Sequence, residues 1–134
     1  MGKVLVTGGC GYIGSHTSVD LINNGYDVIS IDNMSNGHKV LADGVSRITN
    51  KIYDNRCFDL TSRFMVEDFF EKEDIDHVIH FAALKSVPDS VHNPIEYYRN
   101  NIDSLINVLE ASIDYGVKTF VFSSSCSVYG NPDT

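Results

Sequence analysis

The sequence predicts an α/β fold in which a doubly wound parallel sheet carries helices on both faces, giving three layers. Two observations predict it. Short apolar segments such as Val4–Val6 and Thr119–Phe122 alternate with longer segments of helical periodicity, which is typical of parallel strands joined by right-handed crossovers. A glycine-rich stretch also separates the first apolar segment from the first helical one. The length of 134 residues fits one domain over residues 1–134.

The stretch Thr7–Gly14 is the most informative motif. Gly9, Gly11 and Gly14 match G-x-G-x-x-G, while Gly8, Gly11 and Gly14 follow one another with two residues between each pair. Glycine suits such a turn because the chain bends tightly, backbone approaches a pyrophosphate without a Cβ between them, and the helix packs closely on the strand. The amino end of the following helix then receives the phosphates.

The segments after this turn complete a dinucleotide-binding unit. Ile13, Thr17 and Leu21 share one helical face, and Gly25 predicts that the helix ends near Asn24. Residues 27–32 form the second predicted strand, so Asp32 stands at its carboxyl end, where a carboxylate accepts hydrogen bonds from the adenine ribose. A glycine turn alone often marks only a tight connection, but this context predicts a Rossmann-type domain.

The later elements continue the alternation. We expect a helix over 39–49, a strand around Arg56–Phe58, a helix over 62–72, a strand over 76–81, a helix from Pro94 to Gly116 and a strand over 119–122. Asp59 and Leu60 then lie at the carboxyl end of the third strand, where the adenine is expected. The aromatic residues of the 62–72 helix are assigned to the core.

The helix that begins at Pro94 has a wide apolar stripe, formed by Ile95, Tyr98, Ile102, Leu105, Ile106, Leu109 and Ile113. Core packing and contact with a second copy of the chain both explain such a stripe. We keep both interpretations at this stage.

Composition narrows the function classes. With 10 basic and 18 acidic residues the net charge is −8, which argues against nucleic acid or an anionic membrane as partner. The three cysteines form no Cys-x-x-Cys pair, so we expect neither a disulfide framework nor a zinc site. We expect a reducing compartment, namely the cytoplasm. The first residues lack the apolar length of a leader or membrane span. His77 and His80 point to opposite faces of one strand, so no metal site is expected.

Several motifs together resemble the extended short-chain dehydrogenases, and more narrowly the N-terminal part of the UDP-glucose 4-epimerase family. They are Thr7–His16, Asp32-Asn33, Phe81–Lys85, Glu96–Tyr98, Asn100-Asn101 and Ser123–Gly130, and the similarity runs from Lys3 to about Pro132. In that family, bound NAD takes a hydride from C4 of the nucleotide sugar, the 4-keto sugar turns over, and the hydride returns to its other face.

The resemblance also implies roles for individual residues. Those implied to bind the cofactor are Gly8, Gly11, Tyr12, Ile13 and Gly14 at the pyrophosphate, Asp32 and Asn33 at the adenosine ribose, Asp59 and Leu60 at the adenine, Phe81, Ala82, Ala83 and Lys85 beside the nicotinamide, and in addition Asn36, Asn101 and Ser123. Ser125 is implied to be catalytic through a hydrogen bond to the sugar's 4-oxygen. Lys85 and Ser125 are implied to bind the UDP-sugar.

One family motif is missing. The family's base belongs to Tyr-x-x-x-Lys, but none of the seven tyrosines is followed at that spacing by lysine; Tyr129, for example, is followed by Asp133. We therefore expect an N-terminal fragment, truncated after the fifth strand, that lacks the base and the substrate domain and is inactive alone. The parent would be an enzyme with a UDP-sugar as its partner. A homodimer stays one of the two interpretations of the apolar stripe.

Alternative functions remain at this stage. Another NAD-dependent sugar-nucleotide epimerase or dehydratase is one, although neither Ser125 nor Cys126 is acidic, as the 4,6-dehydratases usually require there. A non-catalytic NAD-binding module and a purely structural domain are the others. Lys85 and the serines beside the expected nicotinamide position favour the enzyme. Whether the sugar is N-acetylated stays open.

Overall fold

The computed structural model describes residues 2–130, except for the side chains of Cys126 and Ser127. Its strands are β1 (Lys3–Thr7), β2 (Asp27–Ile31), β3 (Asp54–Arg56), β4 (His77–His80) and β5 (Thr119–Phe122). Within the described part of the chain, they form one parallel sheet in the order β3-β2-β1-β4-β5. The order reverses direction at β1, which places a switch point between β1 and β4.

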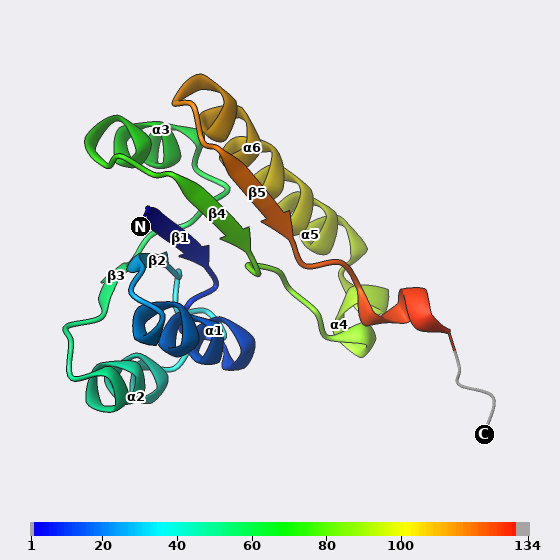
Figure 1. Ribbon diagram of the computed structural model, residues 1–134. Coiled ribbons are helices and arrows are strands. Elements are labelled where there is room, and N and C mark those ends of the chain that lie inside the picture. Colours follow the sequence, from blue (N-terminus) through cyan, green and yellow to red (C-terminus); the bar gives the residue numbers. More distant parts are fainter. Residues whose placement is uncertain (1, 131–134) are drawn as a thin grey trace.

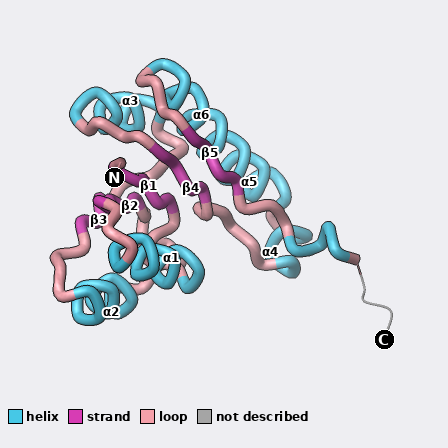
Figure 2. The backbone as a smooth tube through the Cα atoms, viewed as in Figure 1, coloured by secondary structure: helices cyan, strands magenta, loops and turns pink. Residues whose placement is uncertain are grey.

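The helices cover both faces of this sheet. They are α1 (Tyr12–Asn23), α2 (Lys39–Thr49), α3 (Arg63–Lys72), α4 (Val87–His92), α5 (Pro94–Tyr98) and α6 (Ser104–Asp114), with a π-helical turn η1 (Arg99–Asp103) and a 3₁₀ turn η2 (Cys126–Tyr129). Helices α1 and α2 lie on one side of the strands, and α3 and α6 lie on the other (Figure 1). Figure 2 shows the same three layers along the backbone trace. The doubly wound α/β prediction is confirmed.

The third strand was placed wrongly by sequence. The backbone of β2 pairs with Asp54–Arg56, two residues earlier than expected. Phe58 lies beyond the strand, and its ring packs 5.9 Å from the ring of Phe69 on α3. The apolar side chain that suggested a strand is therefore held by core packing, and the strand itself consists of polar residues at the edge of the sheet.

Two hydrophobic clusters hold the layers together. Along β1, Leu5 enters one cluster with α3 and α6, while Val4 and Val6 enter the other with α1 and α2, as the alternation of a strand requires. All three side chains are at most 2% exposed. Phe69 and Phe70 confirm the core assignment on α3, but Phe64 is 77% exposed and contradicts it.

Helix α1 buries a different face from the one that its apolar residues suggested. Ile13 is 51% exposed. The buried residues are Gly14, Ser15, Ser18 and Ile22. Small side chains let the helix approach the sheet and the glycine turn, so close packing outweighs side-chain hydrophobicity on this face.

The helical segment from Pro94 is interrupted, and a short helix precedes it. The π-helical turn η1 separates α5 from α6, and α4 ends immediately before Asn93. Neither feature was expected. Ser86 caps α4 by accepting a hydrogen bond from the backbone N–H of Asp89 at 3.5 Å. None of the helices in the described residues has the length and apolar character needed to cross a membrane.

The wide apolar stripe on this segment mostly faces outward. Helix α6 buries Ser104, Val108, Ala111 and Ser112. Five residues of the stripe are exposed, namely Ile95, Tyr98, Ile102, Ile106 and Ile113. Core packing therefore does not explain them.

Candidate dinucleotide-binding site

The glycine turn connects β1 to α1 at the carboxyl edge of the sheet. Gly8 has a φ of 69°, a left-handed conformation that favours glycine. The turn closes through a hydrogen bond from Gly11 N to Gly8 O at 3.1 Å. Gly11 then precedes α1 without a side-chain cap, and no acidic residue lies in the first turn. The first N–H groups of α1 are thus available to an anion.

The individual glycines are required for different reasons. An added Cβ at Gly14 would collide with the carbonyl of Gly8, so α1 packs on the turn backbone to backbone. A Cβ at Gly9 would collide with Ser30 and would lie 2.5 Å from the hydroxyl of Tyr53. Of the glycines in this turn, Gly11 has the most open surroundings, since a Cβ there would meet only Gly8 O, at 3.2 Å. Close approach of a ligand is therefore a reason for glycine at position 11, whereas packing explains Gly9 and Gly14.

Asp32 follows β2 and is buried, with 8% exposure. Its Oδ2 accepts from Cys10 N and its Oδ1 from Met34 N, both at 2.9 Å. The carboxylate therefore joins the glycine turn to the loop after β2. Burial raises the pKa of the Cys10 thiol to about 11, with the charge of Asp32 adding to the effect, so this thiol stays protonated at neutral pH.

The loop after β2 carries the other predicted ribose residues. Asn33 is exposed, and its Oδ1 accepts from both the backbone N–H and the hydroxyl of Ser35, at 3.0 and 2.7 Å. Asn36 is exposed as well. The loop returns to the glycine turn through a hydrogen bond from His38 N to Cys10 O at 3.0 Å. These residues thus lie next to the turn.

Asp59 and Leu60 follow β3, as predicted. The Oδ1 of Asp59 accepts from the N–H and hydroxyl of Thr61, both at 2.9 Å. Leu60 is only 5% exposed and belongs to the core, where its carbonyl accepts from Asn107 Nδ2 at 2.9 Å. Asp59 thus presents its carboxylate at the surface, and Leu60 contributes mainly to packing.

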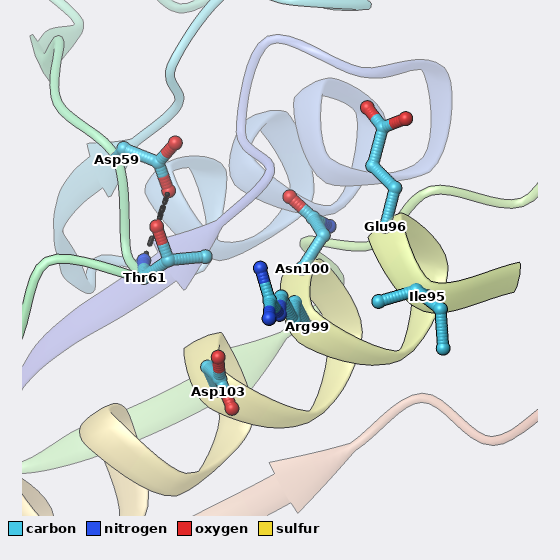
Figure 3. A pocket seen from close by; sticks show the side chains of 7 residues that line it. All are labelled: Asp59, Thr61, Ile95, Glu96, Arg99, Asn100 and Asp103. Atoms are coloured by element: carbon cyan, nitrogen blue, oxygen red, sulfur yellow. Dashed lines mark hydrogen bonds between the residues drawn. The ribbon is translucent and has the colours of Figure 1, made fainter. Parts of the chain in front are cut away.

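A pocket of about 600 Å³ opens beside Asp59. In Figure 3, Asp59 and Thr61 face Arg99 and Asn100 across it. Its other lining residues are Ile95, Glu96 and Asp103. The pocket does not include the glycine turn. The sequence carries no local sign that Arg99 lines this pocket, because its position depends on how α5 and η1 pack over the loop after β3.

Thr7 links the glycine turn to the segment after β4. Its Oγ1 accepts from the backbone N–H groups of Phe81 and Ala82, both at 3.2 Å, and lies 3.0 Å from His80 Nδ1. With two N–H donors already on this oxygen, the hydroxyl proton points to Nδ1, and the ring of His80 carries its own proton on Nε2. The ring stacks near Phe120 and Phe122, and burial lowers its pKa to about 4.

A second clamp holds the segment beyond Ala83. Asn101 on η1 accepts from Leu84 N at 2.7 Å and donates to Leu84 O at 2.9 Å. Both hydrogen-bonding groups of the amide are therefore used on this backbone. Ala83 and Lys85, on either side of Leu84, are exposed at the carboxyl edge.

The serine run lies at the end of β5, beside these residues. Ser123 N donates to His80 O at 3.2 Å, which continues the β4–β5 pairing. Ser123 and Ser125 are both exposed, and Ser125 O accepts from Val128 N at 3.3 Å in the following turn. The predicted residues after β1, β2, β3, β4 and β5 thus share one edge of the sheet.

Comparison with known proteins agrees with this geometry. The model of the NAD dependent epimerase/dehydratase family matches residues 4–134. This chain belongs to that family. Two curated relatives are UDP-glucose 4-epimerases, from Bacillus subtilis (47% identical) and Schizosaccharomyces pombe (46% identical), each match covering 98% of the chain. The chain spans 39% and 37% of the length of these two relatives.

Solved structures of the family superpose closely. A UDP-glucose 4-epimerase from Stenotrophomonas maltophila, with bound NAD and formylated UDP-arabinopyranose, matches all of this chain at 41% identity and a TM-score of 0.92. The enzyme from Bifidobacterium longum, in complex with NAD⁺ and UDP, matches 98% of it at 45% identity and a TM-score of 0.91. The chain covers 40% and 39% of those structures.

Burial of neutral His80 predicts acid sensitivity. The pKa of this histidine falls from about 6.5 in the unfolded chain to about 4 in the folded one. Its contribution to the unfolding free energy is therefore complete above pH 6.5 and is lost as the pH falls toward 4. The loss amounts to roughly 3 kcal/mol of unfolding free energy. Urea unfolding at several pH values should show a flatter pH dependence for His80→Gln than for the wild type. The exposed-histidine control His38→Gln should keep the wild-type slope; equal slopes in all three proteins would contradict the assignment.

Proposed function

We propose that this chain is the NAD-binding part of a UDP-glucose 4-epimerase, which interconverts UDP-glucose and UDP-galactose through a 4-keto sugar. The observation that carries the proposal is the shared carboxyl edge. It presents the uncapped amino end of α1, buried Asp32, and exposed Lys85 and Ser125 together. The free thiols of Cys10 and Cys57 fit a reducing compartment such as the cytoplasm.

The residues at this edge fit NAD. The N–H groups at the start of α1 suit its pyrophosphate, and Gly11 leaves the approach open. Asp32 suits the adenosine ribose, with Asn33 and Asn36 beside it, and Asp59 suits the adenine amino group. When bound, the cofactor accepts a hydride from C4 of the sugar and later returns it. Phe81, Ala82, Ala83, Lys85, Asn101 and Ser123 then form or support the nicotinamide side.

The remaining chemistry is orientation and proton transfer at the sugar. Ser125 forms a hydrogen bond with the 4-oxygen of the sugar, and Lys85 holds the substrate. The 4-hydroxyl loses its proton when the hydride leaves, so a base must receive it. No Tyr-x-x-x-Lys occurs in the 134 residues, so the base would come from a part of the enzyme outside them.

Asp32 predicts a preference for NAD over NADP. A 2′-phosphate would approach a buried carboxylate, and no arginine lies between Asp32 and Arg47. We expect calorimetry to show NADP binding at least about tenfold more weakly, which corresponds to roughly 1.4 kcal/mol. Asp32→Ala should narrow the gap. Equal or tighter binding of NADP by the wild type would rule out this role.

The chemistry predicts separate results for the chain and for the full-length enzyme. The 134-residue chain should bind NAD but should not interconvert UDP-glucose and UDP-galactose in a coupled assay. Full-length enzyme carrying Ser125→Ala should lose about 10² to 10³-fold in turnover while retaining NAD. Ser124→Ala is the matched control, with little loss expected. Sustained epimerisation by the chain alone would overturn the assignment of the base.

The exposed stripe suggests how the protein assembles. Ile95, Ile102 and Ile106 are 64%, 45% and 45% exposed on the α5–α6 segment. An apolar surface of this kind is typical of an interface. We propose that two copies associate through it as a homodimer.

Charge substitutions on the stripe test this assembly. Ile102→Asp together with Ile106→Asp should convert a dimer into a monomer in sedimentation velocity, because two carboxylates would be buried at the interface. Ile48→Asp on α2, where Ile48 is 65% exposed, is the control and should remain dimeric. A wild-type chain that stays monomeric at high concentration would exclude the dimer.

A further inference from the structure

Tyr53 lies in the loop before β3, far along the chain from the glycine turn, yet its hydroxyl reaches that turn. The side chain is 7% exposed and packs in the cluster with α1 and α2. Its hydroxyl lies 3.2 Å from Gly9 O and 2.7 Å from Ser18 Oγ. A hydrogen bond from Tyr53 N to Ser46 Oγ at 3.0 Å holds the backbone of the tyrosine.

The contact with Gly9 fixes one side of a single peptide group. The carbonyl of Gly9 accepts from the Tyr53 hydroxyl, and the N–H of Cys10, which points in the opposite direction from the same peptide group, donates to Asp32. Asp32 follows β2, whereas Tyr53 precedes β3. The peptide plane in the middle of the turn is therefore held from both sides.

This peptide is coupled to the start of α1. The Cα of Gly9 would lie 2.9 Å from a Cβ at Gly14, so the turn and the first helical turn are in direct backbone contact. Ser18 Oγ lies 2.8 Å from Gly14 O and 2.7 Å from the Tyr53 hydroxyl. A shift of the Gly9–Cys10 peptide would thus move the N–H groups that face the phosphates.

The number of hydroxyl protons limits how Tyr53 and Ser18 can bond to the turn. Tyr53 has one proton, which it donates either to Gly9 O or to Ser18 Oγ. In the first case Ser18 donates to Tyr53. In the second case Ser18 donates to Gly14 O, and the buried carbonyl of Gly9 loses the tyrosine's proton, which is unfavourable. The first arrangement is therefore the one that holds the turn. Burial raises the pKa of the Tyr53 phenol, so the proton is retained at neutral pH. Removing the hydroxyl therefore removes the hydrogen bond to Gly9 O.

We propose that Tyr53 is a positioning residue for dinucleotide binding, which holds the Gly9–Cys10 peptide and thereby the amino end of α1 in the geometry that receives a pyrophosphate. This role rests on the proposed NAD-binding function. It adds a residue that lies outside the glycine motif and touches no ligand itself.

The test uses Tyr53→Phe in the 134-residue chain, with NAD as the probe. Calorimetry should show affinity reduced about three- to tenfold, as expected for the loss of a hydrogen bond that sets the geometry of the turn. Amide exchange measured by NMR should be faster at Cys10 and Gly11 in the absence of NAD. Tyr26→Phe, on a half-buried tyrosine that packs on the same cluster, is the matched control and should leave both quantities unchanged.

A second variant separates positioning from stability. In Ser18→Ala the hydroxyl of Tyr53 still donates to Gly9 O, so NAD affinity should stay within about twofold of wild type although a buried hydrogen bond is lost. If Tyr53→Phe fails to fold, Ser18→Ala still tests the role, because an affinity loss in this variant that parallels its loss of stability counts against it. Wild-type NAD affinity in Tyr53→Phe, or an affinity loss in Ser18→Ala that parallels its loss of stability, would overturn the role of Tyr53 while leaving the proposed function intact. A wild-type chain that does not bind NAD would overturn both.

Discussion

The close contact between α1 and the glycine turn is the constraint on which the rest of the carboxyl edge depends. At Gly14 the helix meets the carbonyl of Gly8 with no room for a Cβ, so helix and turn form one rigid piece. That contact sets where the helix begins and which N–H groups remain open. It also explains why the first turns of α1 bury Gly14, Ser15 and Ser18, because only small side chains permit this separation.

The loops around this piece are held by side chains bonded to backbone groups. Asp32 binds the N–H groups of Cys10 and Met34, Thr7 binds those of Phe81 and Ala82, and Asn101 binds both backbone groups of Leu84. Such bonds fix peptide orientation, which packing alone does not. The edge is thus preorganised for a ligand that makes many backbone contacts, as a dinucleotide does.

The apolar surfaces divide into core and exterior in a way that hydrophobicity does not reveal. Helix α6 turns Val108 and Ala111 inward, while Ile106 and Ile113 face outward. Through these inward positions α6 packs in one cluster with α3 and the sheet. The larger side chains are left exposed on the outer face, where the π-helical turn η1 continues the stripe from α5.

The sequence by itself determined the α/β class, the parallel order of elements and the carboxyl edge at which the glycine turn and Asp32 meet. These depend on local signals: apolar runs, glycine spacing and an acid at the end of the second strand. The tertiary structure alone decided the bounds of β3, the buried face of α1, the interruption at η1, and the contacts of Tyr53 and His80. The reason is physical, since each of these depends on contacts between segments distant in sequence, such as Tyr53 with Gly9 and His80 with Thr7, and no local pattern records which residues such contacts bring together.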